Sequence, residues 1–213
     1  MERDTLLNLF KNCNFNNLNK DNFDNKIIKN LNCLLQDFTW NYGETKCCII
    51  LKEADYVIKI PFRGSISCGE EYDFENANFD KEHFWDYCFS ELIYYNLAKR
   101  QKIEKAFAKT RLLGIVQNYP IYIQEKVTTF SSTGFDPYLK NERTEKTRKY
   151  CKEKNFYCFN NRWLADAFQY YGEKRFNKII NFLKDYDIED LHIDNIGYIG
   201  SRPVILDFSD FLD

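Results

Sequence analysis

Near its end the sequence reads Asp190-Leu191-His192-Ile193-Asp194-Asn195-Ile196-Gly197 and then Val204-Ile205-Leu206-Asp207-Phe208-Ser209. An apolar run that ends in Asp207 is typical of a β-strand that delivers a carboxylate at its end, where the carboxylate can bind a hard cation. Asn195 can add a neutral oxygen to the same cation. Asp190 is then free to accept a proton from an incoming hydroxyl. The spacing therefore predicts a site for a metal ion and phosphate.

Two charged residues upstream extend this prediction. Lys59 lies in the β-rich segment 56–61, where strand alternation places it on the same face as Val57 with its ammonium free to reach a phosphate. Glu91 lies on a long helix expected from about Asp80 to Arg100. Taken alone, such residues are usually plain surface charges. They become informative because they precede the terminal segment in a fixed order.

The order of these residues resembles the protein-kinase-like superfamily. Val57-Ile58-Lys59 is similar to the V-A-I-K strand of kinases, and Asp207-Phe208-Ser209 is similar to their D-F-G segment. Asp190, His192 and Asn195 fit the D-x-H-x-x-N loop of aminoglycoside and choline phosphotransferases more closely than the H-R-D-x-x-x-x-N loop of protein kinases. The resemblance extends over residues 40 to 213.

The resemblance implies an α+β fold of the bilobal protein-kinase-like kind. An N-terminal helical extension over residues 1–39 would precede an antiparallel-sheet N-lobe over residues 40–127. A reduced, mostly helical C-lobe would follow over residues 128–213 and carry the catalytic loop and the metal-binding strand.

The resemblance also implies roles for individual residues. Lys59, paired with Glu91, would contact the α- and β-phosphates of ATP, and Asp190 would be the catalytic aspartate. Asn195 and Asp207 would hold Mg²⁺. On the strand that runs into the kinase hinge, Gln124 takes the gatekeeper position, while the backbone groups of Glu125 and Val127 would bind adenine.

Composition limits the classes of partner. The chain has 213 residues, which suffice for one domain or two small lobes, and its net charge of −2 argues against a nucleic-acid-binding protein. No apolar run approaches the length of a membrane span and the first residues do not resemble a signal peptide, so we expect a cytoplasmic protein. The 8 cysteines form no C-x-x-C pair, and with only 2 histidines present we expect reduced structural thiols rather than a zinc site.

Hydrophobic periodicity predicts the remaining elements. Two N-terminal helices, the second capped by Asp21 or Asn22, are expected to pack on the domain that follows. Strands are expected over 46–51, 56–61, 106–116 and 119–127, and residues 64–81 are expected to form a solvated loop. The predicted later helices are 137–154, with Asp136 as its cap and Pro137 in its first position, and 161–184.

Three features depart from the kinase pattern. Only Gly43 is available where a glycine-rich phosphate loop is expected, Ile188-Glu189 replaces the usual residues before the catalytic aspartate, and the sequence stops at Asp213. We expect an ATP- and Mg²⁺-dependent phosphotransferase that transfers the γ-phosphate to a hydroxyl of a protein or small molecule. The alternative is a catalytically inactive, pseudokinase-like module that engages a protein partner. A homodimer or a partner that completes the C-lobe would reconcile both sets of features.

Overall fold

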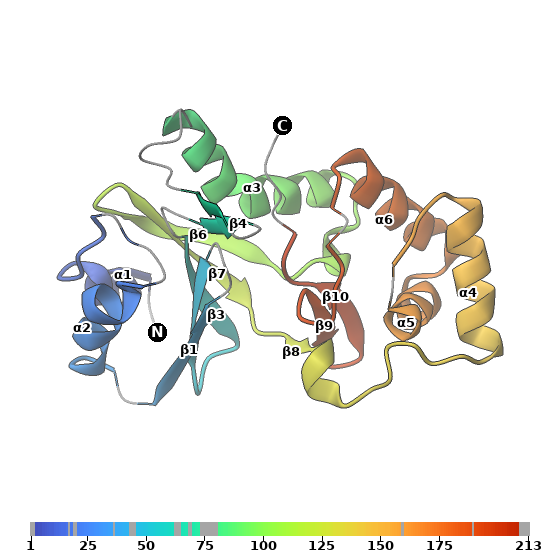
Figure 1. The fold of residues 1–213 in the computed structure, drawn as a ribbon, viewed down its shortest axis with the longest axis horizontal. Coiled ribbons are helices and arrows are strands. Elements are labelled where there is room, and N and C mark those ends of the chain that lie inside the picture. The colour runs from blue at the N-terminus through green and yellow to red at the C-terminus, as the bar shows by residue number, and fades with distance from the viewer. Residues whose placement is uncertain are drawn as a thin grey trace. The chain divides into compact units, whose positions relative to one another are not determined.

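The structure is a computed structural model that describes residues 3–16, 18, 21–35, 37–42, 46–61, 65–67, 70–72, 81–158, 160–188 and 190–208. This described part is α+β, as the sequence predicts, and it has six α-helices and an antiparallel sheet of five strands (Figure 1). The chain forms two compact units. Unit 1 comprises residues 1–89, 110–125 and 211–213, and unit 2 comprises residues 90–109 and 126–210.

The five-stranded sheet is the framework of unit 1. Across the sheet the strands are β1 (Phe38–Tyr42), β2 (Lys46–Leu51), β3 (Tyr56–Pro61), β7 (Tyr119–Glu125) and β6 (Thr110–Val116). The predicted strands β2 and β3 are confirmed. The predicted strand 106–116 begins later, at Thr110, because a 3₁₀ turn occupies Glu104–Ala106. The strand β1 was not predicted.

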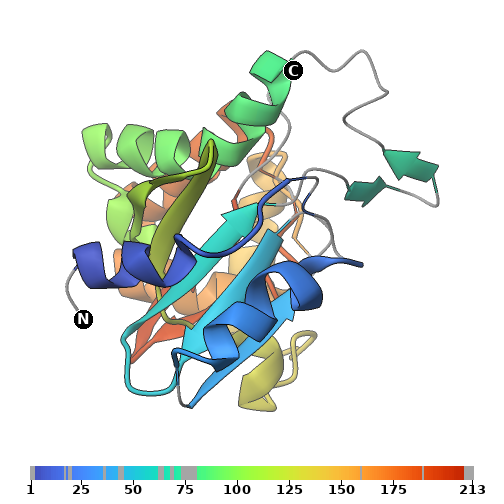
Figure 2. The same cartoon turned by 90° about the vertical axis from the view of Figure 1, so that its left-hand side faces the viewer.

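Two N-terminal helices pack against this sheet (Figure 2), which confirms their predicted packing. Leu6 and Phe10 of α1 (Arg3–Phe10) and Leu31 of α2 (Lys29–Asn32) share one buried cluster with Ile49 and Ile58. A π-helical turn over 24–28 precedes α2, and Phe23 occupies its N-cap position without a side-chain hydrogen bond. The helical residues begin at Phe23, and the Lys26 N–H donates to the Asn22 carbonyl at 3.0 Å, so Asn22 lies at the predicted cap position.

The expected loop over residues 64–81 contains a short hairpin. Strands β4 (Ser65–Ser67) and β5 (Glu70–Tyr72) pair in antiparallel fashion, so the prediction of a loop is wrong for these six residues. Residues 64, 68–69 and 73–80 of that segment lie outside the described residues. So do Gly43, Glu189, Ser209 and Asp213.

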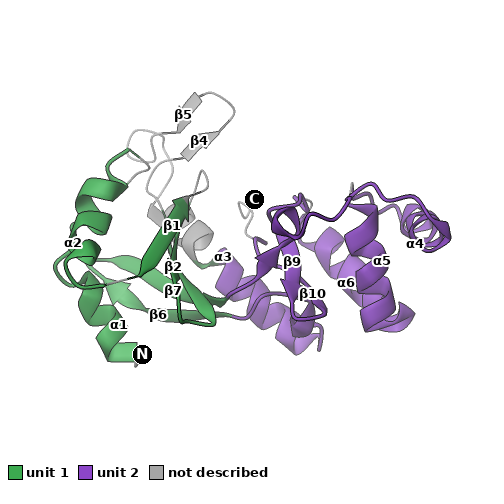
Figure 3. Ribbon diagram, turned by 90° about the horizontal axis from the view of Figure 1, so that it is seen from below, with its two compact units in different colours: residues 1–89, 110–125, 211–213 green, residues 90–109, 126–210 purple. Residues whose placement is uncertain are grey.

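Unit 2 combines a small sheet with helices (Figure 3). The sheet has the strand order β10 (Arg202–Ile205), β9 (Ile196–Ile199) and β8 (Thr128–Thr129). The helices are the second half of α3 (Lys81–Arg100), then α4 (Glu142–Glu153), α5 (Asn161–Tyr171) and α6 (Glu173–Asp185). A 3₁₀ turn, Phe130–Thr133, follows β8. No helix in the described part of the chain is long and apolar enough to cross a membrane.

Two predicted helices differ from those observed. The helix expected from Pro137 begins only at Glu142, because Asn141 and Thr144 form a reciprocal capping box there. Asp136 instead accepts a hydrogen bond from the Tyr138 backbone N–H at 2.9 Å, in a turn. The helix expected over 161–184 is split into α5 and α6 at Gly172, whose φ of +71° ends the first helix.

Three helices of unit 2 end in the same kind of turn. The residue with a positive φ is Lys102 after α3, Asn155 after α4 and Asp187 after α6. The residue that follows it is buried in each case, and these residues are Ile103, Phe156 and Ile188. In each case that buried residue donates its backbone N–H to a carbonyl five residues earlier, which defines a Schellman motif. These turns direct the chain sharply away from each helix, and the last of them leads directly into Asp190.

Candidate active site

In unit 2 the structure brings Asp190 and Asn195 together. The Asn195 amide Nδ2 donates to the Asp190 carboxylate Oδ2 at 3.1 Å and to the Asp190 backbone carbonyl at 3.0 Å. The Asp190 side chain is 79% exposed, so its other oxygen faces solvent. The loop from Asp190 to Asn195 thus holds one carboxylate in a defined position and leaves it accessible.

Backbone hydrogen bonds fix this loop on several sides. The Ile193 carbonyl accepts from the Ser131 N–H at 3.1 Å, and the His192 carbonyl accepts from the Asn195 N–H at 3.0 Å. The Cys158 thiol lies 3.8 Å from the Leu191 carbonyl, and the Leu191 side chain is buried. These contacts anchor the loop from within unit 2.

Asp207 lies beside Asn195 because the backbone joins them. The Asn195 carbonyl accepts from the Leu206 N–H at 2.9 Å and lies 3.5 Å from the Asp207 nitrogen. The next residue, Phe208, is buried, and its ring meets that of Phe107 edge-on at a centroid distance of 5.1 Å. Phe107 also forms a parallel bridge with Ile205 at the end of β10. Asp207 is therefore held between a strand end and a buried aromatic anchor.

His192 projects from the same loop. Its Nδ1 accepts the Asp194 backbone N–H at 3.1 Å, so the neutral imidazole carries its proton on Nε2. Nε2 lies 3.6 Å from the Asp190 Oδ2, which is longer than a hydrogen bond. His192 therefore presents an N–H toward the side of the loop that holds Asp190.

Two further predicted residues belong to unit 2. Glu91 is almost fully buried on α3, with 1% of its surface exposed. A buried carboxylate needs a compensating partner, and Glu91 is not without one. Val127 is half-buried just before β8, where its side chain packs close to Gly197. The Gly197 carbonyl in turn accepts the Trp163 indole N–H at 3.2 Å.

The other predicted residues lie on neighbouring strands of unit 1. Lys59 on β3 is only 3% exposed, so the interpretation of an exposed lysine on a half-buried strand is wrong. Gln124 on β7 is 1% exposed and donates its Nε2 to the Thr110 hydroxyl at 2.9 Å. Glu125, the last residue of β7, pairs with Tyr56 and is half-buried.

The oxygen-bearing side chains of the terminal segment are the predicted ligands of a cation. Among the residues that the structure describes, no group of three or more His, Cys, Asp or Glu side chains is placed to bind a metal. Mg²⁺ needs fewer, because it keeps waters and binds one or two carboxylates together with phosphate oxygens. The Asn195 amide nitrogen donates to Asp190, and the Asn195 backbone carbonyl meets the backbone of Leu206 and Asp207.

Sequence reasoning missed a polar network on the small sheet. The Tyr198 hydroxyl donates to Asp166 Oδ2 at 2.7 Å, and Arg143 forms an ion pair with Asp166 Oδ1 at 2.7 Å. Burial first, and then the bond to Asp166, raise the pKa of Tyr198 well above its usual range. Arg143 and Asp166 lie on different helices, and the residue pattern within each helix does not show which helices come together.

No protein-family model matches the chain, and no curated protein matches it in sequence. The geometry of the candidate residues therefore carries the functional argument.

Proposed function

We propose that this protein is an ATP- and Mg²⁺-dependent phosphotransferase with a bilobal, kinase-like arrangement. In it, the γ-phosphate of ATP passes to a hydroxyl of a protein or small-molecule acceptor. The order of Lys59, Glu91, Asp190, Asn195 and Asp207 suggested this function, and the geometry of the terminal loop supports it further.

One observation carries the proposal. Asn195 links the other two residues of the terminal set, because its amide nitrogen binds the Asp190 carboxylate and its carbonyl accepts backbone N–H bonds from the segment 206–207. Phosphoryl transfer needs such a carboxylate next to a cation site.

The chain's own residues divide the work. The exposed carboxylate oxygen of Asp190 accepts the proton of the acceptor hydroxyl while the hydroxyl oxygen bonds to the γ-phosphorus. The bond between the γ-phosphorus and the bridging oxygen then breaks, and ADP is released. Asn195 keeps Asp190 oriented. Asn195 Oδ1 and Asp207 are the groups that would hold Mg²⁺, which draws charge from the phosphate oxygens when it is bound.

Residues elsewhere in the chain would bind the nucleotide. Lys59 is assigned to the α- and β-phosphates with Glu91 as the residue that orients it. Both side chains are almost fully buried, at 3% and 1% exposed, and neither is without a partner, as the cost of burying a charge requires. Glu125 and Val127 are assigned to adenine through their backbone groups, with Gln124 beside them.

The test is thermal stabilisation by ATP, with and without Mg²⁺. A ligand that binds only the folded state stabilises it by about 2.7 kcal/mol at about 100 times its Kd. We expect a metal-dependent rise in the melting temperature that Asp207→Ala abolishes. Asp190→Asn should keep this rise and lose transfer of labelled γ-phosphate to acceptors in a metabolite and protein screen.

Asp194→Asn is the matched control, because Asp194 is an exposed carboxylate on the same loop, 65% exposed, with no assigned role. It should keep both binding and transfer. Transfer retained by Asp190→Asn would contradict the role of Asp190. The absence of any shift at millimolar nucleotide would contradict the whole proposal and favour the protein-binding module.

A further inference from the structure

The first turn of α5 and the residues before it contact the terminal segment at two places within unit 2. The Trp163 indole N–H donates to the Gly197 carbonyl at 3.2 Å, and Trp163 is buried. The Cys158 thiol, just before the helix, lies 3.8 Å from the Leu191 carbonyl. Leu191 is the second residue of the loop 190–195, and Gly197 follows that loop by two residues. The two contacts therefore hold the loop near both of its ends.

Asn160 joins these two contacts into one unit. Its side-chain Oδ1 accepts the Trp163 backbone N–H at 2.9 Å and so caps α5. Its backbone N–H forms a hydrogen bond with the Cys158 sulfur. Asn160 is itself buried, at 2% exposed. Because one buried residue fixes both Trp163 and Cys158, the two points of contact with the loop keep a defined separation.

The bond from Trp163 supports β9 at the point where its neighbouring strand ends. β8 pairs with β9 only through Thr128 and Thr129, and Thr129 faces Gly197. Gly197 is buried, and a buried carbonyl without a donor is unfavourable. Loss of the indole N–H would therefore favour a shift of β9 close to Asn195.

The other end of α5 binds the same hairpin in a different way. The Tyr171 hydroxyl donates to the Pro203 carbonyl on β10 at 2.5 Å. Between Pro203 and Asp207, however, Ile205 is held by a separate contact, because its carbonyl accepts the Ala108 N–H at 2.8 Å. Tyr171 therefore stabilises the hairpin without setting the position of Asp207.

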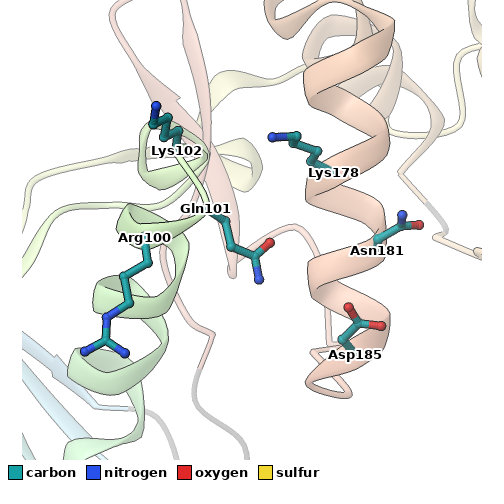
Figure 4. A pocket seen from close by; sticks show the side chains of 6 residues that line it. All are labelled: Arg100, Gln101, Lys102, Lys178, Asn181 and Asp185. Carbon is teal, nitrogen blue, oxygen red and sulfur yellow. The ribbon is translucent and has the colours of Figure 1, made fainter.

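The polar hollow between the end of α3 and α6 shows a different arrangement (Figure 4). It has a volume of about 440 Å³, and Arg100, Lys102 and Lys178 are among its lining residues. Figure 4 shows Arg100 and Lys102 pointing away from each other and from the space between the two helices. These exposed side chains share no common point of contact, whereas the contacts of α5 converge on one loop. Lys178 is therefore suited as a surface control in the same unit.

We propose that Trp163 is a positioning residue for the loop 190–195. Its indole N–H holds the start of β9, and the Asn160 cap carries the same constraint to the start of the loop. The proposal rests on the proposed phosphotransferase function, in which Asp190 must meet the acceptor hydroxyl. Transfer is sensitive to such placement, because a displacement of about 1 Å can lower a rate about a hundredfold.

Two variants separate the N–H of Trp163 from its size. Trp163→Phe keeps a large ring and removes the N–H, whereas Trp163→His keeps an N–H on a five-membered ring and removes volume. The measurement is ADP formation from ATP and Mg²⁺ with water as the acceptor. We expect kcat to fall about tenfold in Trp163→Phe and less in Trp163→His, with KM for ATP within about twofold in both.

The melting temperature should follow the opposite order. It should fall further in Trp163→His than in Trp163→Phe, because the smaller ring leaves a cavity in the core. A larger loss of kcat in Trp163→His than in Trp163→Phe would show that packing alone matters, and it would overturn the proposal.

Tyr171→Phe and Lys178→Gln are the controls. Tyr171→Phe breaks a buried hydrogen bond of the same helix, so it should lower the melting temperature and keep kcat. Lys178→Gln should change neither. A loss of kcat in Tyr171→Phe as large as that in Trp163→Phe would overturn the proposal, because the effect would then follow the stability of the hairpin.

The ring of His192 reports the position of the loop without any need for activity. The chain has 2 histidines, so a His83→Gln background leaves His192 as the single histidine signal in an NMR spectrum. In that background Trp163→Phe should shift the His192 ring signals, and Tyr171→Phe should leave them in place. Unchanged His192 signals in Trp163→Phe would overturn the positioning role.

This spectrum also separates the two proposals. A wild-type protein that shows neither ADP formation nor a Mg²⁺-dependent stabilisation by ATP would contradict the proposed function. His192 signals that move in Trp163→Phe and not in Tyr171→Phe would in that case still support the role of Trp163 in holding the loop.

Discussion

Two lysines of the five-stranded sheet are almost fully buried, Lys59 on β3 at 3% exposed and Lys46 on β2 at 4% exposed. Neither is without an interaction partner in the structure, as the cost of burying an ammonium requires. Only Lys59 has a role in the proposed phosphotransferase. The two residues therefore provide a comparison matched in residue type, burial and sheet.

We expect Lys59→Met to lower the rate of phosphate transfer at least about a hundredfold, which is the usual effect of removing one group that stabilises charge in the transition state. Lys46→Met should leave that rate within about threefold, since it removes a buried charge without an assigned contact to phosphate. The measurement is ADP formation per folded protein, with folding checked by circular dichroism. Equal losses in the two variants would mean that Lys59 acts through the stability of the sheet.

Individual residues differ in how far the sequence predicts them. The proximity of Asp190 and Asn195 is predictable, because five residues of a tight loop bring two short polar side chains within reach. The burial of Lys59 is not. It arises because β3 lies between β2 and β7 and residues 58–61 are buried on both faces of the strand, an outcome of long-range packing that the alternation of one strand does not reveal.

Pairing of β8 with β9 depends on one glycine. A Cβ atom on Gly197 would lie 2.2 Å from the Thr128 carbonyl oxygen and 2.9 Å from the Thr129 Cα. Backbone atoms cannot yield as the end of a side chain can. Any larger residue would force the two strands apart. It would also displace Val127, whose side chain would lie 2.7 Å from the added atom.

We expect Gly197→Ala to reduce the free energy of unfolding by about 1–3 kcal/mol, the usual cost of overpacking a rigid site. Urea unfolding followed by circular dichroism measures the change. Gly200→Asn is the control on the following turn, since Gly200 has a φ of +60° with open space around it and asparagine tolerates that conformation. A smaller loss for Gly197→Ala than for Gly200→Asn would refute this account of the strand pair.

Elements were predicted best where local sequence determines them. The paired strands β2 and β3 follow from two β-rich runs around a polar turn. The start of α4 was misplaced because Asp136-Pro137 is a strong cap signal, although Asn141 and Thr144 form the actual box. The strand β1 was missed although Phe38, Thr39, Trp40 and Tyr42 all favour a strand, and pairing with β2 places it at the edge of the sheet.

At the scale of the whole molecule, buried thiols and phenols lie in both units. Burial raises the pKa of Cys13 in unit 1 to about 11 and that of Cys151 in unit 2 to about 12. Burial also raises the pKa of Cys47 and Tyr171 well above their usual ranges. None of these groups belongs to the proposed site, so together they report on the stability of the fold.

These pKa shifts predict how stability depends on pH. Unfolding restores an ordinary thiol, whose pKa is 9.0, whereas the folded thiols retain their protons up to about pH 11 to 12. Above the unfolded pKa the folded state therefore binds more protons than the unfolded state. The free energy of unfolding then falls as pH rises, by up to about 1.4 kcal/mol per pH unit for each such group.

Urea unfolding midpoints between about pH 8 and about pH 10.5, measured in the presence of a reductant, give this slope. Cys151→Ala should reduce the slope, because it removes one thiol that stays protonated only in the folded state. Cys33→Ser is the control and should leave the slope unchanged, because Cys33 is exposed. A free energy of unfolding that stays constant up to about pH 10.5, well above the unfolded pKa, would show that the thiols of the folded state are not buried as described.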